Sequence, residues 1–211
     1  MKPHRHNKES GIADRISMLR YKNGREDICL LGMYFPTKPS NARQKKEYWR
    51  VSNLMLTWIR EKISMLPMRT LLMTYGDIND DFGLARTDGN QFVPVHSHSV
   101  GSQRVGQEKF VSTQLRQVFE ANCQAICSTF WKTKPTYIGH GAKSFIDTFT
   151  ISLEHLSQVQ DYRAMQRLAA QFICITSKIY DHIPIMMFLF HHVAEKKKTS
   201  LFGIGTVLCV A

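Results

Sequence analysis

The chain has 211 residues, of which 43% are apolar, and this size suits one domain with a hydrophobic core. Charged residues make up 21% of the chain, which excludes a disordered polyelectrolyte. The apolar stretches are shorter than the roughly 20 residues that a membrane-spanning helix needs, and no apolar segment of a secretory signal follows the basic start. We therefore expect a globular protein that makes no membrane contact.

Basic side chains outnumber acidic ones and concentrate at the front of the chain. The net charge is +11, and residues 1–50 carry twelve basic and five acidic side chains, a net +7. Such a surplus attracts polyanions, above all nucleic acid, although a solvated basic surface explains it almost as well. The five cysteines form no CxxC pair, which indicates a reducing compartment, and we expect an intracellular protein of the nucleus or cytoplasm.

A hairpin and a helix are the first elements predicted along the chain. Residues 15–18 and 28–35 are predicted strands, and the second, ICLLGMYF, is apolar throughout, which favours burial on both faces. Asn41 is a candidate cap for a helix over residues 42–63. Its apolar positions recur at helical spacing and predict that one face packs on a sheet, through Val51, Met55 and Ile59.

The middle of the chain contains a buried strand and a polar segment. Residues 70–75 are the predicted strand, and it stops at the sequence GDINDD. Residues 84–106 are rich in Gly, Ser, His and Asp, and we expect them to form a long loop. Its His96 and His98 could bind a metal, but exposed loop histidines are the commoner case.

The remaining predicted elements are a helix, two strands and an amphipathic stretch. The helix is predicted over residues 112–130 and the strands over 144–152 and 183–190. The amphipathic stretch covers residues 161–170. The helix would place Cys123 and Cys127 on one face, where packing in the core is a better explanation than a zinc site.

Polar clusters stand at the ends of the predicted strands or within them, and together they could cleave a phosphodiester. They are Tyr34 after CLLGM, Asp77 and Asn79 in YGDIND, Asp147 in SFIDTF, and Asp181 and His182 in YDHIPI. Cleavage needs an activated water and compensation of charge on the phosphoryl oxygens. Carboxylates hold Mg²⁺, and a histidine oriented by a second carboxylate can exchange a proton with the phosphoryl group. Each cluster alone is typical of a turn or a salt bridge.

The order and spacing of these clusters, over residues 15–190, resemble the endonuclease/exonuclease/phosphatase superfamily. This superfamily includes abasic-site endonucleases, DNase I and the endonuclease domains of non-LTR retrotransposons. The matching segments are GMYFPTKPS, EYWRV, YGDIND, TFWKTKPTY, SFIDTF and YDHIPI. The resemblance implies an α/β fold, the four-layer α/β/β/α sandwich of DNase I, and a monomeric Mg²⁺-dependent endonuclease of retrotransposon-like origin that acts on DNA, or on RNA. It also implies a domain over residues 15–192, a basic tail over 1–14 and a C-terminal extension over 193–211.

The resemblance implies a role for each of these polar residues. Tyr34 would hydrogen-bond the scissile phosphate, Asp77 would orient or deprotonate the attacking water, and Asn79 would help to hold the phosphate. Asp181 would lie near the metal. His182 would contact the phosphate as acid or base, with Asp147 fixing its tautomer.

The front of the chain departs from the family pattern. The family has a strand that ends in a metal-binding glutamate before the tyrosine motif, but only 33 residues precede Tyr34 and no apolar strand among them ends in Glu. We therefore expect an N-terminally truncated member with an incomplete sandwich and weak or lost Mg²⁺ binding. The alternatives are an inactive remnant that at most binds nucleic acid, and a relative that acts on a phospholipid or phosphoinositide.

Overall fold

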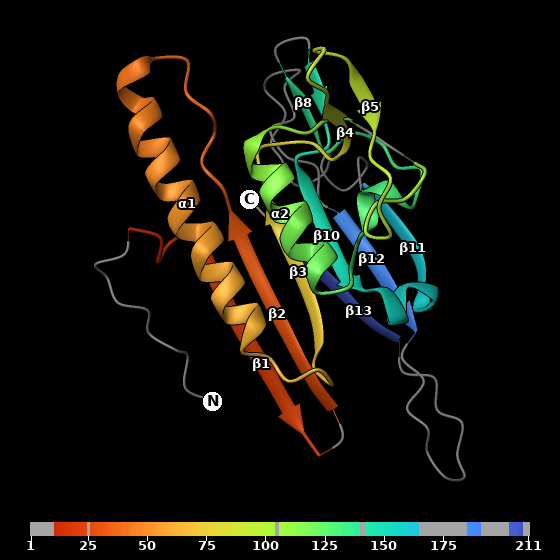
Figure 1. The fold of residues 1–211 in the computed structure, drawn as a ribbon. Helices are drawn as coiled ribbons and strands as arrows, with labels where there is room; N and C mark the ends of the chain where they lie inside the picture. The colour runs from red at the N-terminus through yellow and green to blue at the C-terminus, as the bar shows by residue number, and fades with distance from the viewer. Residues whose placement is uncertain are drawn as a thin grey trace, which may run out of the picture.

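A five-stranded sheet, in the order β1-β2-β3-β10-β7, forms the centre of the protein (Figure 1). Its strands are β1 (Ile16–Asn23), β2 (Glu26–Tyr34), β3 (Leu71–Asp77), β10 (Asp147–Ser152) and β7 (Gln124–Ile126). β1 and β2 form the predicted hairpin, β3 runs parallel to β2, and β10 pairs antiparallel with both β3 and β7. The computed structural model describes residues 11–24, 26–103, 106–139, 142–164, 185–190 and 203–208.

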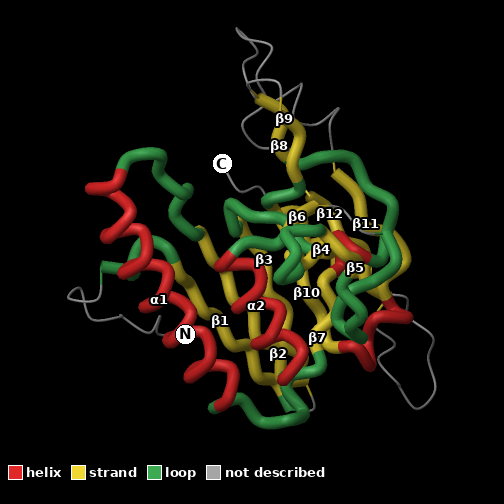
Figure 2. The backbone as a smooth tube through the Cα atoms, turned by 45° about the horizontal axis from the view of Figure 1, so that its top comes forward, coloured by secondary structure: helices red, strands yellow, loops and turns green. Residues whose placement is uncertain are grey.

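Helix α1 (Ala42–Ser64) makes the crossover that the parallel pair β2–β3 requires. Asn41 caps it as predicted, because its side-chain Oδ1 accepts a hydrogen bond from the backbone N of Gln44 at 2.8 Å. The predicted inward face is confirmed, with Met55 and Ile59 fully buried and Val51 nearly so. Helix α2 (Phe110–Ala121) lies beside α1, and Figure 2 shows both helices on the same side of the sheet.

A second sheet covers the other face of the first. It consists of β11 (Val159–Ala164), β12 (Ile185–Phe190) and β13 (Gly203–Leu208). β12 matches the strand predicted over residues 183–190, but it is not the last strand as predicted, because β13 follows it and pairs with it. The two sheets touch through side chains, because the centres of the Phe149 and Tyr162 rings lie 6.3 Å apart. The sulfur of Cys127, the residue that follows β7, lies 3.8 Å from that of Met187. The described layers are therefore helices, sheet and sheet. No helix within the described ranges is long and apolar enough to cross a membrane.

The expectation of one long loop over residues 84–106 is confirmed only in part. This region contributes to a three-stranded sheet of β4 (Gly83–Arg86), β5 (Phe92–Pro94) and β6 (Gly106–Gln107). A turn joins β4 to β5, in which Asn90 takes φ 60 and Thr87 N donates to the Gln91 carbonyl. Strands of two to four residues are too short to show a period in the sequence.

The predicted helix over 112–130 ends earlier, at Ala121. Cys123 takes φ 50, a conformation that terminates a helix, and the chain continues into β7 and the 3-10 helix η2 (Cys127–Thr129). Cys123 is exposed and Cys127 is buried, so they do not share a helix face.

Three further predictions differ in detail. The strand predicted over 144–152 is divided between β9 (Ala142–Ser144), which pairs with β8 (Tyr137–Gly139), and β10. A 3-10 helix, η3 (Leu153–Gln158), follows β10. The first four residues of the stretch 161–170 belong to β11, and the others lie outside the described residues.

Candidate functional site

Strand register brings three of the predicted residues together at one end of the central strands of the first sheet. In the parallel pair β2–β3, Tyr34 stands opposite Asp77, and in the antiparallel pair β3–β10, Asp147 stands opposite Asp77. Opposed residues in neighbouring strands project to the same face. That face packs against the second sheet, because Tyr75 and Phe149, two residues along these strands, belong to the cluster between the sheets.

Asp77 and Asn79 are locked together by hydrogen bonds. Asp77 Oδ1 accepts from Asn79 N at 2.7 Å, and Oδ2 accepts from Asn79 Nδ2 at 3.0 Å. Asn79 Nδ2 also donates to the Phe35 carbonyl at 2.8 Å, and Thr37 Oγ1 donates to Asn79 Oδ1 at 3.1 Å. Both amide hydrogens of Asn79 are thus engaged, so contact with a phosphate requires one of these bonds to break. In this structure Asn79 positions Asp77.

The backbone at this strand end needs residues that tolerate positive φ. Gly76 takes φ 143, and a Cβ there would lie 1.8 Å from the Met33 carbonyl oxygen. Asn79 takes φ 50, a region in which Asn is among the favoured non-glycine residues. The sequence YGDIND therefore lets β3 approach β2 closely and then turn immediately beyond Asp77.

Arg15 lies beside Tyr34 and is absent from the sequence-based set of site residues. Its guanidinium carbon is 5.3 Å from the centre of the Tyr34 ring, and its Nη1 donates to the Tyr34 carbonyl at 3.4 Å. Tyr34 is 44% exposed, so ring and guanidinium together present a donor and a positive charge. The signal was available, because a hairpin that pairs Ile16 with Met33 brings the residue before Ile16 next to Tyr34.

One segment connects the start of β10 with the second sheet. Asp147 N donates to Thr136 Oγ1 at 3.1 Å, and Ala164 N donates to Thr133 Oγ1 at 3.1 Å. Ala164 pairs with Ile185, the first residue of β12. β12 therefore starts at the same end of the molecule as Asp147.

Asp181 and His182 lie outside the described residues, so their roles stay predictions. In the described part of the chain, no group of three or more His, Cys, Asp or Glu residues is placed to hold a metal. His96 and His98 are exposed, as expected of loop histidines.

The two acids that follow Asn79 have structural contacts. The Asp80 carboxylate is buried at the start of α2, where Oδ2 accepts from Ser112 N at 3.2 Å and from Ser112 Oγ at 2.9 Å. Lys109 Nζ lies 3.4 Å from Asp80 Oδ1. Burial raises the pKa of Asp80, and Lys109 and Ser112 oppose that rise. Asp81 Oδ1 accepts from Phe145 N at 2.8 Å.

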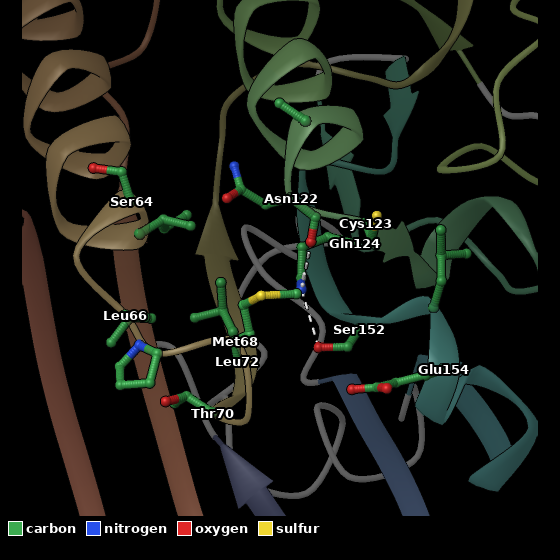
Figure 3. A pocket seen from close by; sticks show the side chains of 14 residues that line it. Ser64, Leu66, Met68, Thr70, Leu72, Asn122, Cys123, Gln124, Ser152 and Glu154 are labelled. Atoms are coloured by element: carbon green, nitrogen blue, oxygen red, sulfur yellow. Dashed lines mark hydrogen bonds between the residues drawn. The ribbon is translucent and has the colours of Figure 1, made fainter.

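A pocket of about 450 Å³ lies at the opposite end of β3 and β10 (Figure 3). Its lining includes Thr70, which precedes β3, and Ser152, the last residue of β10. Gln124 Nε2 donates to Ser152 Oγ there at 3.1 Å. A strand of this length spans roughly 20 Å, so the pocket is separate from the edge that carries Asp77.

Comparison with known proteins gives matches among solved structures. No family model matches the sequence, and no curated protein matches it. The 3′ phosphatase NExo from Neisseria, bound to a product DNA hairpin, superposes with a TM-score of 0.54 at 10% identity, over 89% of this chain and 71% of that one. An AP endonuclease from Archaeoglobus fulgidus gives 0.52 at 13% identity, over 87% and 68%. In structure, the chain is similar to these members of the endonuclease/exonuclease/phosphatase superfamily.

At such low identity the likeness to this superfamily concerns the fold alone. It confirms the predicted mixed α/β class with two sheets. The endonuclease domain of TRAS1, a telomere-specific non-LTR retrotransposon, gives a TM-score of 0.47 at 16% identity, over 82% of this chain and 60% of that domain. The chain thus spans 60 to 71% of the lengths of these three structures.

Proposed function

We propose that the chain is a Mg²⁺-dependent phosphodiesterase domain of retrotransposon-like origin that cleaves DNA. The observation that supports this proposal most is the register that places Tyr34 and Asp147 on either side of Asp77. These residues come from three distant segments, and their side-chain types suit water activation and phosphate binding. The proposal includes a domain over residues 15–192 of the α/β/β/α sandwich type.

In the proposed reaction, the scissile phosphate lies against Tyr34 and Arg15, which offer a hydroxyl donor and a positive charge. Asp77, held by Asn79, accepts a proton from the attacking water as its oxygen bonds to phosphorus. His182 donates a proton to the leaving oxygen as the phosphorus–oxygen bond breaks, and Asp147 holds the imidazole in the tautomer this needs. Protons and electron pairs balance, since one proton is taken up by Asp77 and one is given by His182.

The two aspartates of the proposed site are both buried. Asp77 and Asp147 are 1% and 5% exposed and stand directly opposite each other. We propose that His182 lies beside Asp147, and that weakly bound Mg²⁺ has Asp181 as a ligand.

DNA is the proposed substrate because of the charge of the chain. A net charge of +11 favours a polyanion over a single phospholipid headgroup. The second candidate function is binding of nucleic acid without cleavage. The same net charge favours it, because binding of a polyanion needs no catalytic group.

The test is cleavage of supercoiled plasmid and of an abasic-site duplex by the purified chain, with Mg²⁺ or with EDTA. We expect cleavage only with Mg²⁺, and a fall of about 10² to 10⁴-fold in Asp77→Asn and in His182→Ala, because each removes a proton-transfer group. Glu154→Gln is the matched control, since it is the same type of change at an exposed position after β10. Equal cleavage by all variants would show a contaminating nuclease. DNA binding without any cleavage would support the second candidate.

A further inference from the structure

A basic, partly aromatic cleft lies beside the candidate site. Its volume is about 550 Å³, within the range of small-molecule sites. It is enclosed by the segment after β2, by the sheet of β4 and β5 and by the start of α2. The lining residues that matter here are Lys38, Arg86, Phe92, Glu108, Lys109 and Phe110.

Positive charge predominates in the cleft. The only acid among its lining residues is Glu108, whose side chain is fully buried and accepts hydrogen bonds from Arg116 Nε at 2.9 and 3.0 Å. Lys109 is ion-paired with Asp80. Neither Lys38 nor Arg86 forms an ion pair with another residue of the described ranges. An anion would be attracted to this surface.

The aromatic side chains narrow the choice of anion. Phe92 is 39% exposed and stands opposite Arg86 in the register of β4 and β5, so ring and guanidinium share a face. Phe110 packs edge-to-face against Trp49, and the two ring centres lie 4.6 Å apart. An exposed ring among cations suits a planar base attached to a phosphate, as in proteins that bind single strands. Inorganic phosphate would make no use of Phe92.

Neighbouring residues connect the cleft with the candidate site. Thr37, which hydrogen-bonds Asn79 at 3.1 Å, is followed directly by Lys38. Lys109 pairs with Asp80, the residue after Asn79. A strand whose phosphate lies at Asp77 could therefore continue into the cleft.

We propose that this cleft binds one unpaired nucleotide next to the scissile phosphate, with its base on Phe92 and its phosphate near Lys38 and Arg86. The inference rests on the proposed function, because it takes the candidate site as the place of cleavage. A base that stacks on Phe92 cannot remain stacked within a duplex. The cleft thus gives the protein a preference for single-stranded or frayed DNA over continuous duplex.

The test is binding of labelled oligothymidylate and of a matched duplex to the full chain, by fluorescence anisotropy in EDTA. We expect Phe92→Ala to weaken single-strand binding about tenfold, and duplex binding less than twofold, because stacking is lost only where the base is unpaired. Val93→Ala is the control: Val93 neighbours Phe92 on β5, is equally exposed and does not line the cleft. It should leave both affinities unchanged.

Unchanged single-strand binding by Phe92→Ala, or an equal loss for both DNAs, would overturn the proposal. Thymidine monophosphate should bind much more weakly than the oligonucleotide, and equal affinities would show a site for free nucleotides instead of a strand. Since EDTA prevents metal-dependent cleavage, these results do not depend on turnover. A negative result in the cleavage experiment is therefore distinguishable from a negative result in the binding experiment on the cleft.

Discussion

Position 76 accepts only glycine, for two separate reasons. Its φ of 143 is a conformation that side chains rarely adopt, and a Cβ would lie 1.8 Å from the Met33 carbonyl oxygen. We expect Gly76→Ala to lower the free energy of unfolding by about 3 kcal/mol or more, because backbone strain and a backbone clash add. Urea denaturation measures this loss.

Gly24 supplies the matched control for that prediction. It takes φ 54 in the turn between β1 and β2, and no other atom lies within 4 Å of a Cβ built there. Gly24→Ala should cost only about 1 to 2 kcal/mol, the usual penalty for a left-handed residue. Equal losses in the two variants would show that the Met33 contact adds nothing.

The polar residues of the site show what sequence alone can predict at this scale. Tyr34 and Asp77 end strands that the apolar pattern predicts, so their presence at one edge follows from strand order. The engagement of both Asn79 amide hydrogens depends on Phe35, which belongs to another strand end, and no local pattern encodes it. Arg15 comes to lie beside Tyr34 through the hairpin register, which pairs Ile16 with Met33 and is not encoded in any local motif.

Among the elements, α1 was predictable and the end of α2 was not. The signals of α1 are local: a capping asparagine and apolar residues at helical spacing. Beyond α2 the chain has no Gly or Pro at the break, and Cys123 itself takes the positive φ. The apolar residues of β7 continue the helical spacing into Cys127, so the pattern extends past the true end.

Asp80 couples two elements, since it follows the end of β3 and accepts hydrogen bonds at the start of α2. Its pKa is raised above 3.8, mainly by burial, so the folded state binds this proton more tightly than the unfolded state. The corresponding stability is present below pH 3.8 and is lost as the pH rises through the raised pKa. We therefore expect the free energy of unfolding of the wild type, relative to Asp80→Asn, to fall over that range.

Urea denaturation of both proteins at a series of pH values measures this difference, which should become constant above the raised pKa. A difference that grows with pH would mean that Lys109 and Ser112 outweigh burial and lower the pKa of Asp80. Aspartate and asparagine have nearly the same side-chain volume, so packing contributes little to the comparison.

At the scale of the whole molecule, the candidate site lies at the boundary between two hydrophobic cores. One core packs the helices on the first sheet, and the other packs the two sheets together. Tyr34 and Asn79 belong to neither. Substitution of Tyr34 should therefore alter chemistry more than folding. Substitution of Asn79 should alter both, because Asn79 takes φ 50 and its side chain is hydrogen-bonded to Asp77 and Phe35.

With a net charge of +11, DNA binding could depend on the total charge of the protein or on the basic residues of one face. Arg86→Gln and Arg69→Gln change the net charge equally, but Arg86 lines the basic cleft and Arg69 lies just before β3, near Asp27. Each phosphate contact on a single strand contributes about 0.7 to the slope of log Kd against log salt concentration. We expect Arg86→Gln to lose about that much slope and Arg69→Gln to keep it. Equal losses in both would show that the basic surplus acts as a diffuse field, as a solvated surface does, and that no face of the protein is specialised for DNA.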